Sequence, residues 1–321
     1  MSSGAEPSTA EHDAADLVAR MRAGERRAIA EAATECERAG ARPGSRLGAL
    51  MHAMQPHLGQ ARLIGLTGPP GAGKSTLVNA LIAHVRGLGL TVGVIAVDPS
   101  SPISGGAILG DRVRMTAALD DDGVFVRSVA SRGALGGLSP AAVRVVDALD
   151  AAGFDVVMIE TVGTGQSEID IAEVADVRIV VNAPGLGDDI QAMKSGLLEI
   201  ADVLVVNKGD RPDADATLAQ LKSATAIRSA RVPVLKCSAT TGEGIEALWE
   251  TVSPLAGAAL QVAPEIRRRR RARTLIARAA AEMLARRVRS GEIDRLGPLA
   301  DDLLQGRLSL DEAARRLLEG T

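Results

Sequence analysis

Residues 61–76 read ARLIGLTGPPGAGKST, an apolar run followed by a glycine-rich loop and the start of an amphipathic stretch. The segment from Gly68 to Ser75 matches GxxxxGK[ST], which binds nucleotide phosphates when it follows a strand and opens a helix. Glycine is needed where backbone N–H groups turn inward around phosphate oxygens, because a Cβ atom would block the close approach. We expect a strand at 61–67, a phosphate loop, and a helix from Thr76 to Val85.

The sequence beyond this loop is typical of an α/β fold. Between residues 61 and 256, short β-rich runs alternate with amphipathic stretches, as in sheets whose strands are joined by crossover helices. Several runs are apolar on both faces, as a helix-covered parallel sheet requires. We therefore expect a P-loop NTPase with a mostly parallel sheet flanked by helices. The expected strands are 61–67, 91–97, 124–128, 156–161, 177–182, 203–207 and 232–236.

Helical segments are expected on either side of this domain. Residues 1–14 are polar and acidic without periodicity, and are predicted to be a disordered leader. A helical pattern begins at Ala15, so residues 15–60 are predicted to form an N-terminal helical extension. The strand pattern stops after Pro254, and residues 257–321 are predicted to form helices only.

Composition excludes several classes of protein. Of 321 residues, 46% are hydrophobic and 24% charged, as in ordinary globular proteins. The 37 basic and 40 acidic residues give a net charge of −3, which does not favour nucleic acid or an anionic membrane as a partner. Cys36 and Cys237 are isolated, so neither a disulfide framework nor a zinc site is indicated. Without a secretory signal or an apolar run of membrane length, a cytoplasmic location is expected.

A second motif predicts that the base is guanine. Residues 207–210 read NKGD after an expected strand, and the carboxylate of Asp210 can accept from the ring N–H and the exocyclic amine of guanine. Adenine offers no such pair of donors, so GTP is favoured over ATP. Lys208 is expected to cross the base and contact the phosphate loop, and Asn207 to tie the two loops together. The residues expected to bind GTP or GDP are Gly68, Pro69, Pro70, Gly71, Ala72, Gly73, Lys74, Ser75, Thr76, Asn207, Lys208, Asp210, Ser238, Ala239 and Thr240.

Oxygen-bearing side chains near the expected strand ends predict a Mg²⁺ site. Glu160 ends an apolar strand and precedes Thr-Val-Gly, at the position where P-loop NTPases hold Mg²⁺ and sense the γ-phosphate. With the hydroxyl of Ser75, the acids Asp98 and Asp111 complete the expected metal set, since Mg²⁺ takes a few protein oxygens plus water and phosphate. Asp98 has the alternative of a helix N-cap, and Asp111 that of a solvated loop acid.

Three residues are expected to serve catalysis. Lys74 supplies a cation to the β- and γ-phosphates. Glu160 is expected to act at the metal. Gln166 follows the glycine-rich turn and is expected to orient the attacking water, as a glutamine does in other GTPases.

Several motifs taken together resemble the MeaB/ArgK family, whose animal members are the methylmalonic aciduria type A proteins. The motifs are GPPGAGKST, VDPSS, GDRVRM, ETVGTGQSE, PGLGDDIQAMK and NKGD, and the resemblance runs over about residues 15–320. The resemblance implies a homodimeric GTPase whose C-terminal helices form a dimerisation arm. It also implies a chaperone that gates cobalamin loading or protection of an adenosylcobalamin-dependent acyl-CoA mutase, chiefly methylmalonyl-CoA mutase.

The resemblance also carries residue roles. It implies Lys74 and Ser75 at phosphate and Mg²⁺, with the three acids around the metal. It identifies residues 188–194 as an additional switch with Asp188 and Lys194 as its polar ends, whereas the residues alone indicate only a Gly/Pro turn followed by a helix start.

Two other functions compete with this interpretation. A GTPase that inserts nickel or cobalt would need Cys pairs or His-rich tracts, and this chain has four scattered His and two isolated Cys. A nucleic-acid binder could use the arginines at 267–271, but nothing in the sequence reads bases. The run is expected instead to cover a dimer interface or to pair with acids such as those at 301–302.

Overall fold

The structure is a computed structural model that describes residues 8–38, 45–98, 121–130, 138–161, 167–185, 197–226, 232–293 and 296–319. Contacts divide the chain into two compact units, Met1–Arg271 and Ala272–Thr321.

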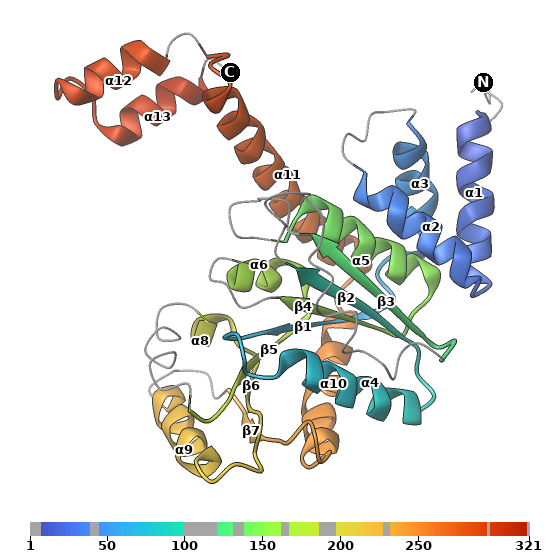
Figure 1. The fold of residues 1–321 in the computed structure, drawn as a ribbon. Coiled ribbons are helices and arrows are strands. Elements are labelled where there is room, and N and C mark those ends of the chain that lie inside the picture. Colours follow the sequence, from blue (N-terminus) through green and yellow to red (C-terminus); the bar gives the residue numbers. More distant parts are fainter. Residues whose placement is uncertain are drawn as a thin grey trace. The chain divides into compact units, whose positions relative to one another are not determined.

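A seven-stranded sheet with the order β3-β2-β4-β1-β5-β6-β7 forms the centre of the first unit (Figure 1). Every pairing among the described strands is parallel. Each strand coincides with an expected one to within a few residues, so the predicted fold class is confirmed. The strands are β1 (Arg62–Thr67), β2 (Val92–Asp98), β3 (Val124–Ala130), β4 (Val156–Thr161), β5 (Val177–Asn182), β6 (Val203–Val206) and β7 (Val234–Lys236).

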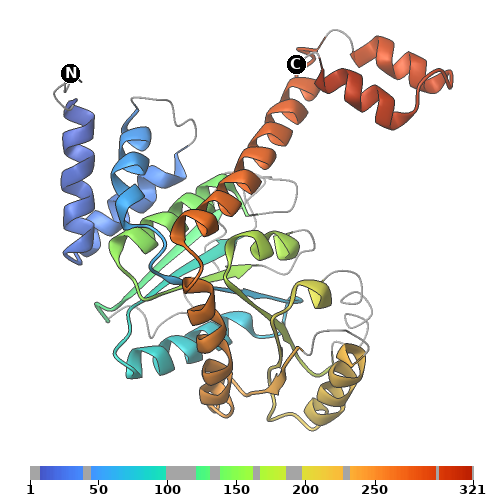
Figure 2. The same ribbon diagram turned by 180° about the vertical axis from the view of Figure 1, so that it is seen from behind.

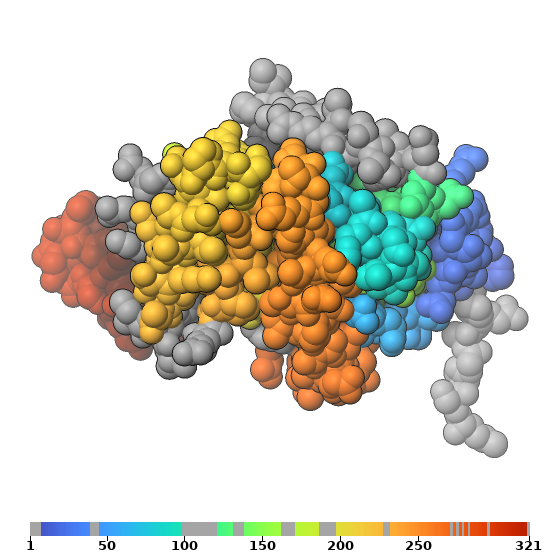
Figure 3. Space-filling model, turned by 90° about the horizontal axis from the view of Figure 1, so that it is seen from below, coloured from blue at the N-terminus to red at the C-terminus, as the bar shows by residue number. Residues whose placement is uncertain are grey.

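Helices cover both faces of the sheet (Figures 1 and 2). On one face, α4 (Lys74–Gly87) and α10 (Ile245–Leu260) share a buried apolar cluster with the strands, to which α4 contributes Leu81 and α10 contributes Trp249. Figure 3 shows this side, with α10 in orange beside α4 in cyan. The other face carries α5 (Pro140–Ala152), α6 (Ser167–Val174) and α8 (Leu197–Ile200), and α9 (Ala214–Thr225) packs on β6 and β7.

The N-terminal extension consists of α1 (Thr9–Arg22), α2 (Arg26–Glu37) and α3 (Arg46–Met54). The expected helix start at Ala15 is wrong, because a capping box begins the helix earlier. The N–H of Glu11 donates to the Ser8 hydroxyl at 3.3 Å, and the N–H of Ser8 donates to the Glu11 carboxylate at 2.7 Å. This reciprocal pair satisfies two donors at the helix start, so residues 9–14 are helical rather than part of a leader.

Side-chain contacts join the extension to the sheet domain. The guanidinium of Arg144 in α5 donates to the carbonyl of Cys36 at 2.8 Å, and that of Arg26 donates to the carbonyl of Val124 in β3 at 2.8 Å. Since these contacts come from two elements of the domain, α1 to α3 form part of the first unit.

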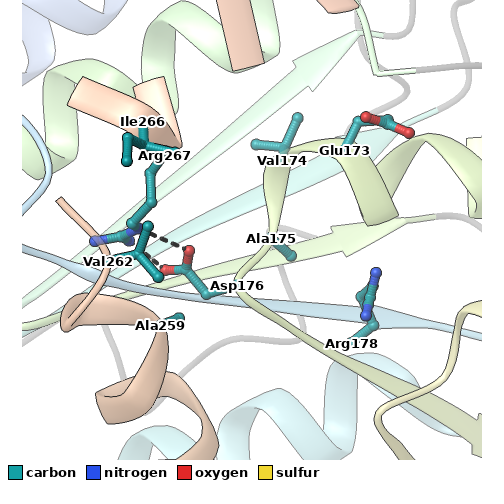
Figure 4. Close-up of a pocket in the computed structure, with 9 residues that line it drawn as sticks. All are labelled: Glu173, Val174, Ala175, Asp176, Arg178, Ala259, Val262, Ile266 and Arg267. Carbon is teal, nitrogen blue, oxygen red and sulfur yellow. Dashed lines mark hydrogen bonds and ion pairs between the residues drawn. The ribbon is translucent and has the colours of Figure 1, made fainter. Parts of the chain in front are cut away.

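A buried ion pair ties the start of α11 (Pro264–Arg289) to the amino-terminal edge of the sheet. Arg267 contacts the carboxylate of Asp176 at 2.5 and 3.1 Å, and the two side chains are only 8% and 10% exposed (Figure 4). Arg267 also donates to the carbonyl of Gly59 at 3.2 Å, while Asp176 accepts the N–H of Leu63 at 3.0 Å. Arg267 therefore pairs with Asp176 rather than with the acids at 301–302.

A second buried carboxylate completes this edge. Asp150, which is 1% exposed, accepts the backbone N–H groups of Gly59, Gln60 and Ala61 at 2.5, 3.0 and 2.8 Å. Arg267, near the start of α11, donates to the Gly59 carbonyl of the same turn at 3.2 Å. The division between units falls after Arg271, later than the boundary expected after residue 256.

A cavity of about 200 Å³ lies beside the ion pair (Figure 4). Its apolar wall includes Val174, Val262 and Ile266. Of its two arginines, Arg267 pairs with Asp176, and Arg178 makes two bonds of 2.7 Å to the Asp202 carboxylate. The cavity's cations are thus engaged within the fold.

The second unit is helical, as expected, and contains the rest of α11 with α12 (Leu296–Leu304) and α13 (Leu310–Leu318). Ser309 caps α13 by accepting the N–H of Glu312 at 3.2 Å. Leu304, Leu310 and Leu318 are 84%, 68% and 60% exposed. Across the described parts of both units, no helix has the length and apolar character needed to cross a membrane.

Replacing Arg267 by alanine should destabilise the first unit, because Asp176 would remain buried without its cation. We expect the free energy of unfolding to fall by about 3–5 kcal/mol, measured by urea denaturation. Arg20→Ala is the control, since Arg20 pairs with Glu25 at the surface and such pairs contribute little. Equal losses in the two variants would contradict the anchoring role of Arg267.

Candidate functional site

The phosphate loop connects β1 to α4 at the carboxyl edge of the sheet. Two of its glycines are required by the backbone. Gly68 has φ +139°, and a Cβ there would lie 2.0 Å from the carbonyl oxygen of Val181 in β5. Gly73 has φ +86°, and a Cβ there would lie 2.5 Å from the side-chain nitrogen of Asn207. Any larger residue would push the loop away from β5 and from Asn207.

Lys74, the first residue of α4, turns its side chain back into the loop. It is only 7% exposed, and its Nζ donates to the carbonyl oxygens of Gly68 at 2.7 Å and Pro69 at 3.0 Å. The loop therefore encloses a buried cation next to its own backbone, where phosphate oxygens would meet it.

Asn207 contacts the phosphate loop, as expected, and also joins it to the loop at 238–240. Its Nδ2 donates to the carbonyls of Ala72 at 3.0 Å and Gly73 at 3.2 Å, and its Oδ1 accepts the N–H of Ala239 at 3.1 Å. Lys208 makes the expected contact with the loop, since its Nζ donates to the carbonyl of Gly71 at 2.7 Å. The phosphate loop and the segments at 207–208 and 238–240, which are far apart in sequence, are thereby held together around the expected nucleotide site.

The carboxylate of Asp210 is oriented by a hydroxyl. The Oγ of Ser238, a residue with no exposed surface, donates to Asp210 Oδ1 at 2.7 Å. This hydrogen bond lowers the pKa of Asp210, so the carboxylate is ionised at neutral pH. An ionised carboxylate only accepts hydrogen bonds, which suits a base edge that presents two donors.

Glu160 and Ser75 meet at the other side of the phosphate loop. The Ser75 Oγ donates to Glu160 Oε1 at 2.6 Å, and Glu160 is 5% exposed. In the sheet register, Glu160 pairs with Leu66 of β1 and with Ala96 of β2. A hydroxyl and a carboxylate in contact at the loop form a donor set that suits Mg²⁺, which prefers oxygen ligands.

Of the other residues expected to hold the metal, to orient water or to form the switch, the structure describes only the backbone of Asp98. The backbone of Asp98 ends β2 at the same edge, directly after the paired Val97 and Thr161. Asp111, Gln166, Asp188 and Lys194 lie outside the described residues.

The sequence analysis missed three buried polar residues at this edge. Thr161 and Thr67, which end β4 and β1, share a hydrogen bond of 2.9 Å between their hydroxyls. Asn182 ends β5, and its buried Nδ2 has no hydrogen-bond partner among the residues that the structure describes, which is costly for an amide. Each is a polar residue at the carboxyl end of a largely apolar strand, which is the signal that could have identified it.

Comparisons with known proteins agree with this site. A sequence model of the family described as methylmalonyl-CoA mutase-associated GTPase MeaB matches residues 29–292. The chain is 47% identical over 244 residues to a protein of Pyrococcus horikoshii named as a GTPase, covering 74% of this chain and 76% of that one. It is 40% identical over 246 residues to the GTPase ArgK of Escherichia coli, covering 74% of each.

A solved structure is similar over nearly the whole chain. The crystal structure of a protein described as LAO/AO transport system kinase matches with a TM-score of 0.74 and 30% identity, covering 96% of this chain and 97% of that one. The family match covers the sheet, the phosphate loop and the NKGD segment together. This chain therefore belongs to the MeaB family of P-loop GTPases.

Proposed function

We propose that this GTPase gates cobalamin loading or protection in an adenosylcobalamin-dependent acyl-CoA mutase, with methylmalonyl-CoA mutase as the client. The observation that carries the proposal is the match to a family described by its association with that mutase. The site supports it because a nucleotide-dependent chaperone needs a site that binds and hydrolyses GTP. The assembly that the family resemblance implies is a homodimer, and the location that we predict from the sequence is the cytoplasm.

In this proposal the phosphate loop binds the phosphates of GTP, the segment at 207–210 binds the base, and Asn207 joins the two. Lys74 neutralises charge on the β- and γ-phosphates, and Asp210 accepts from the guanine ring N–H and amine. Lys208 covers the base while its Nζ contacts the Gly71 carbonyl. Most of the catalytic effect then comes from positioning and charge neutralisation, with Gln166 orienting the attacking water.

Ser75 and Glu160 would hold Mg²⁺, with Asp98 and Asp111 as the further acids. The fit rests on the chemistry of the observed pair, a hydroxyl and a carboxylate 2.6 Å apart beside the loop. When bound, the metal neutralises phosphate charge during transfer. We place the relay of nucleotide state to the mutase at residues 188–194, with Asp188 and Lys194 as its polar ends.

The metal-insertion alternative finds no support among the described residues. No group of three or more His, Cys, Asp or Glu that could hold a metal ion occurs there. Cys36 and Cys237 are both buried, and burial raises the pKa of each thiol to about 12. A thiol with so high a pKa is a poor source of the thiolate that soft metals require.

Changing Asp210 to asparagine should change the base preference. The amide would direct N–H donors at guanine's own donors, so we expect GTP affinity to fall by about 100-fold or more and xanthosine triphosphate to bind better than GTP. Titration with fluorescent nucleotides measures both. Asp213→Asn, at an exposed acid of the same loop, should leave both affinities unchanged. Unaltered GTP affinity in Asp210→Asn would contradict the base site.

Replacing Glu160 by glutamine should weaken the binding of Mg²⁺ by the protein without disturbing the phosphate loop. The amide oxygen can still accept from Ser75, but the charge is gone, so the Mg²⁺ concentration for half-maximal GTP hydrolysis should rise about tenfold or more. Phosphate release across a Mg²⁺ series measures this. Glu246→Gln, at an exposed position on α10, is the matched control. An unchanged Mg²⁺ dependence would remove Glu160 from the metal set.

Adding methylmalonyl-CoA mutase should stimulate hydrolysis. We expect slow phosphate release from GTP, none from ATP, and a clear rise of the GTP rate when purified mutase is added. The Asp210→Asn variant should lose the stimulated rate with GTP. GTP hydrolysis that does not respond to mutase would retain the GTPase and reject this client.

A further inference from the structure

A fully buried hydrogen bond joins the two strands that flank the phosphate site. The hydroxyl of Thr161 lies 2.9 Å from that of Thr67 and 3.5 Å from the carbonyl of Leu66. Both threonines have 0% exposure. Thr67 directly precedes Gly68, and Thr161 directly follows Glu160. The bond therefore links the start of the phosphate loop to the strand end that carries Glu160.

The loop is thus held at each end by successive residues of β4. Ser75 follows the loop and bonds to Glu160 at 2.6 Å, while Thr67 precedes the loop and bonds to Thr161. Successive side chains of a strand point to opposite faces. The two bonds accordingly lie on opposite faces of β4 and together fix where its end lies relative to the loop.

Binding of metal would involve the two hydrogen bonds differently, since one joins Ser75 to Glu160 and the other joins Thr67 to Thr161. If Ser75 and Glu160 hold Mg²⁺, as proposed above, both side chains would offer lone pairs to the ion, and their mutual hydrogen bond would be shared with metal binding. The bond between Thr67 and Thr161 uses neither metal residue and can persist. It would then add to the pairing of β4 with β1 and β2 in holding the end of that strand.

Fold stability alone does not explain why both positions carry hydroxyls. Replacing both partners of a buried hydrogen bond by apolar groups of similar shape is often nearly neutral. A pair of valines would suit the apolar interiors of β1 and β4 and their strand propensity. The threonine pair lies at the ends of β1 and β4 beside the phosphate loop. There the position of the strand ends determines where the expected phosphate and metal ligands lie.

We propose that Thr161 and Thr67 are positioning residues for GTP hydrolysis. Their hydroxyl bond fixes the end of β4, and with it the Glu160 carboxylate, relative to the phosphate loop. The inference rests on the proposed metal role of Glu160. Neither threonine touches the reacting atoms, so both act through the strand end.

The test compares Thr161→Val, Thr67→Val and the double variant with the unaltered full chain. We expect kcat for GTP at saturating Mg²⁺ to fall about three- to tenfold in each single variant, while the Kd for GDP stays within about twofold. The double variant should lose no more than Thr161→Val, since the bond between the two hydroxyls is removed in all three and only the long 3.5 Å contact of Thr161 with the Leu66 carbonyl differs. Thr161→Ser, which keeps the hydroxyl, should retain most of kcat.

Thr225→Val provides a matched control. Thr225 is also buried, at 6% exposure, but its hydroxyl donates to the Leu221 carbonyl in its own helix α9 at 3.0 Å. Its loss should change the melting temperature slightly and leave kcat unchanged. A structural role of the same kind for Thr161 would give the same pattern.

Three results would overturn the positioning role. These are a kcat within twofold of the unaltered chain in folded Thr161→Val, additive losses in the double variant, and an equal loss in Thr161→Ser. If Thr161→Val does not fold, Thr67→Val decides alone, because it removes the same bond from the other side. A full chain that binds no GDP, or a Glu160→Gln variant with normal Mg²⁺ dependence, would count against the proposed site instead.

Discussion

The side-chain amide of Asn207 is the contact on which the arrangement of the site depends. Its three hydrogen bonds reach the carbonyls of Ala72 and Gly73 and the N–H of Ala239, and the residue is only 2% exposed. A nucleotide has a fixed length, so a protein that binds both of its ends must hold two loops at a fixed separation. An amide does this because it donates and accepts at once. A carboxylate at this position could only accept, and would leave one loop unattached.

The two edges of the sheet divide stability from function. At the amino edge, Asp150 and Asp176 are buried and accept backbone N–H groups, and Arg267 neutralises the second of them. These contacts fix the turn into β1 and the start of α11. The carboxyl edge instead presents Lys74, Glu160 and Asp210 around the loops, as parallel sheets do at the ends of their strands. At the amino edge, the charged groups bond to one another and to the backbone of the fold. At the carboxyl edge, they lie around the loops that we expect to bind the nucleotide.

The sequence predicts contacts that belong to a motif and misses those that depend on packing. All seven strands and the link from Asn207 to the phosphate loop follow from hydrophobic runs and from motif spacing. The bond between Thr67 and Thr161 does not, because it joins strands whose adjacency is set by the sheet order. Likewise, Arg267 looks like one member of a basic run, and only the fold shows Asp176 beside it. The early start of α1 was readable from Ser8 and Glu11, so that error came from an overlooked capping box.

A glutamate at residue 160 makes the carboxylate part of the phosphate loop's own support. Its side chain reaches Ser75 at 2.6 Å from the end of β4. An aspartate at the same backbone position would be shorter by one carbon–carbon bond, about 1.5 Å, and would leave room for a water between acid and hydroxyl. With glutamate, the hydroxyl donates directly to the acid, and lone pairs of both groups remain for a metal. Metal and nucleotide binding are then coupled to whatever else fixes the end of β4. In this chain the pairing with β1 and β2 does so, together with the hydroxyl bond between Thr161 and Thr67 on the opposite face.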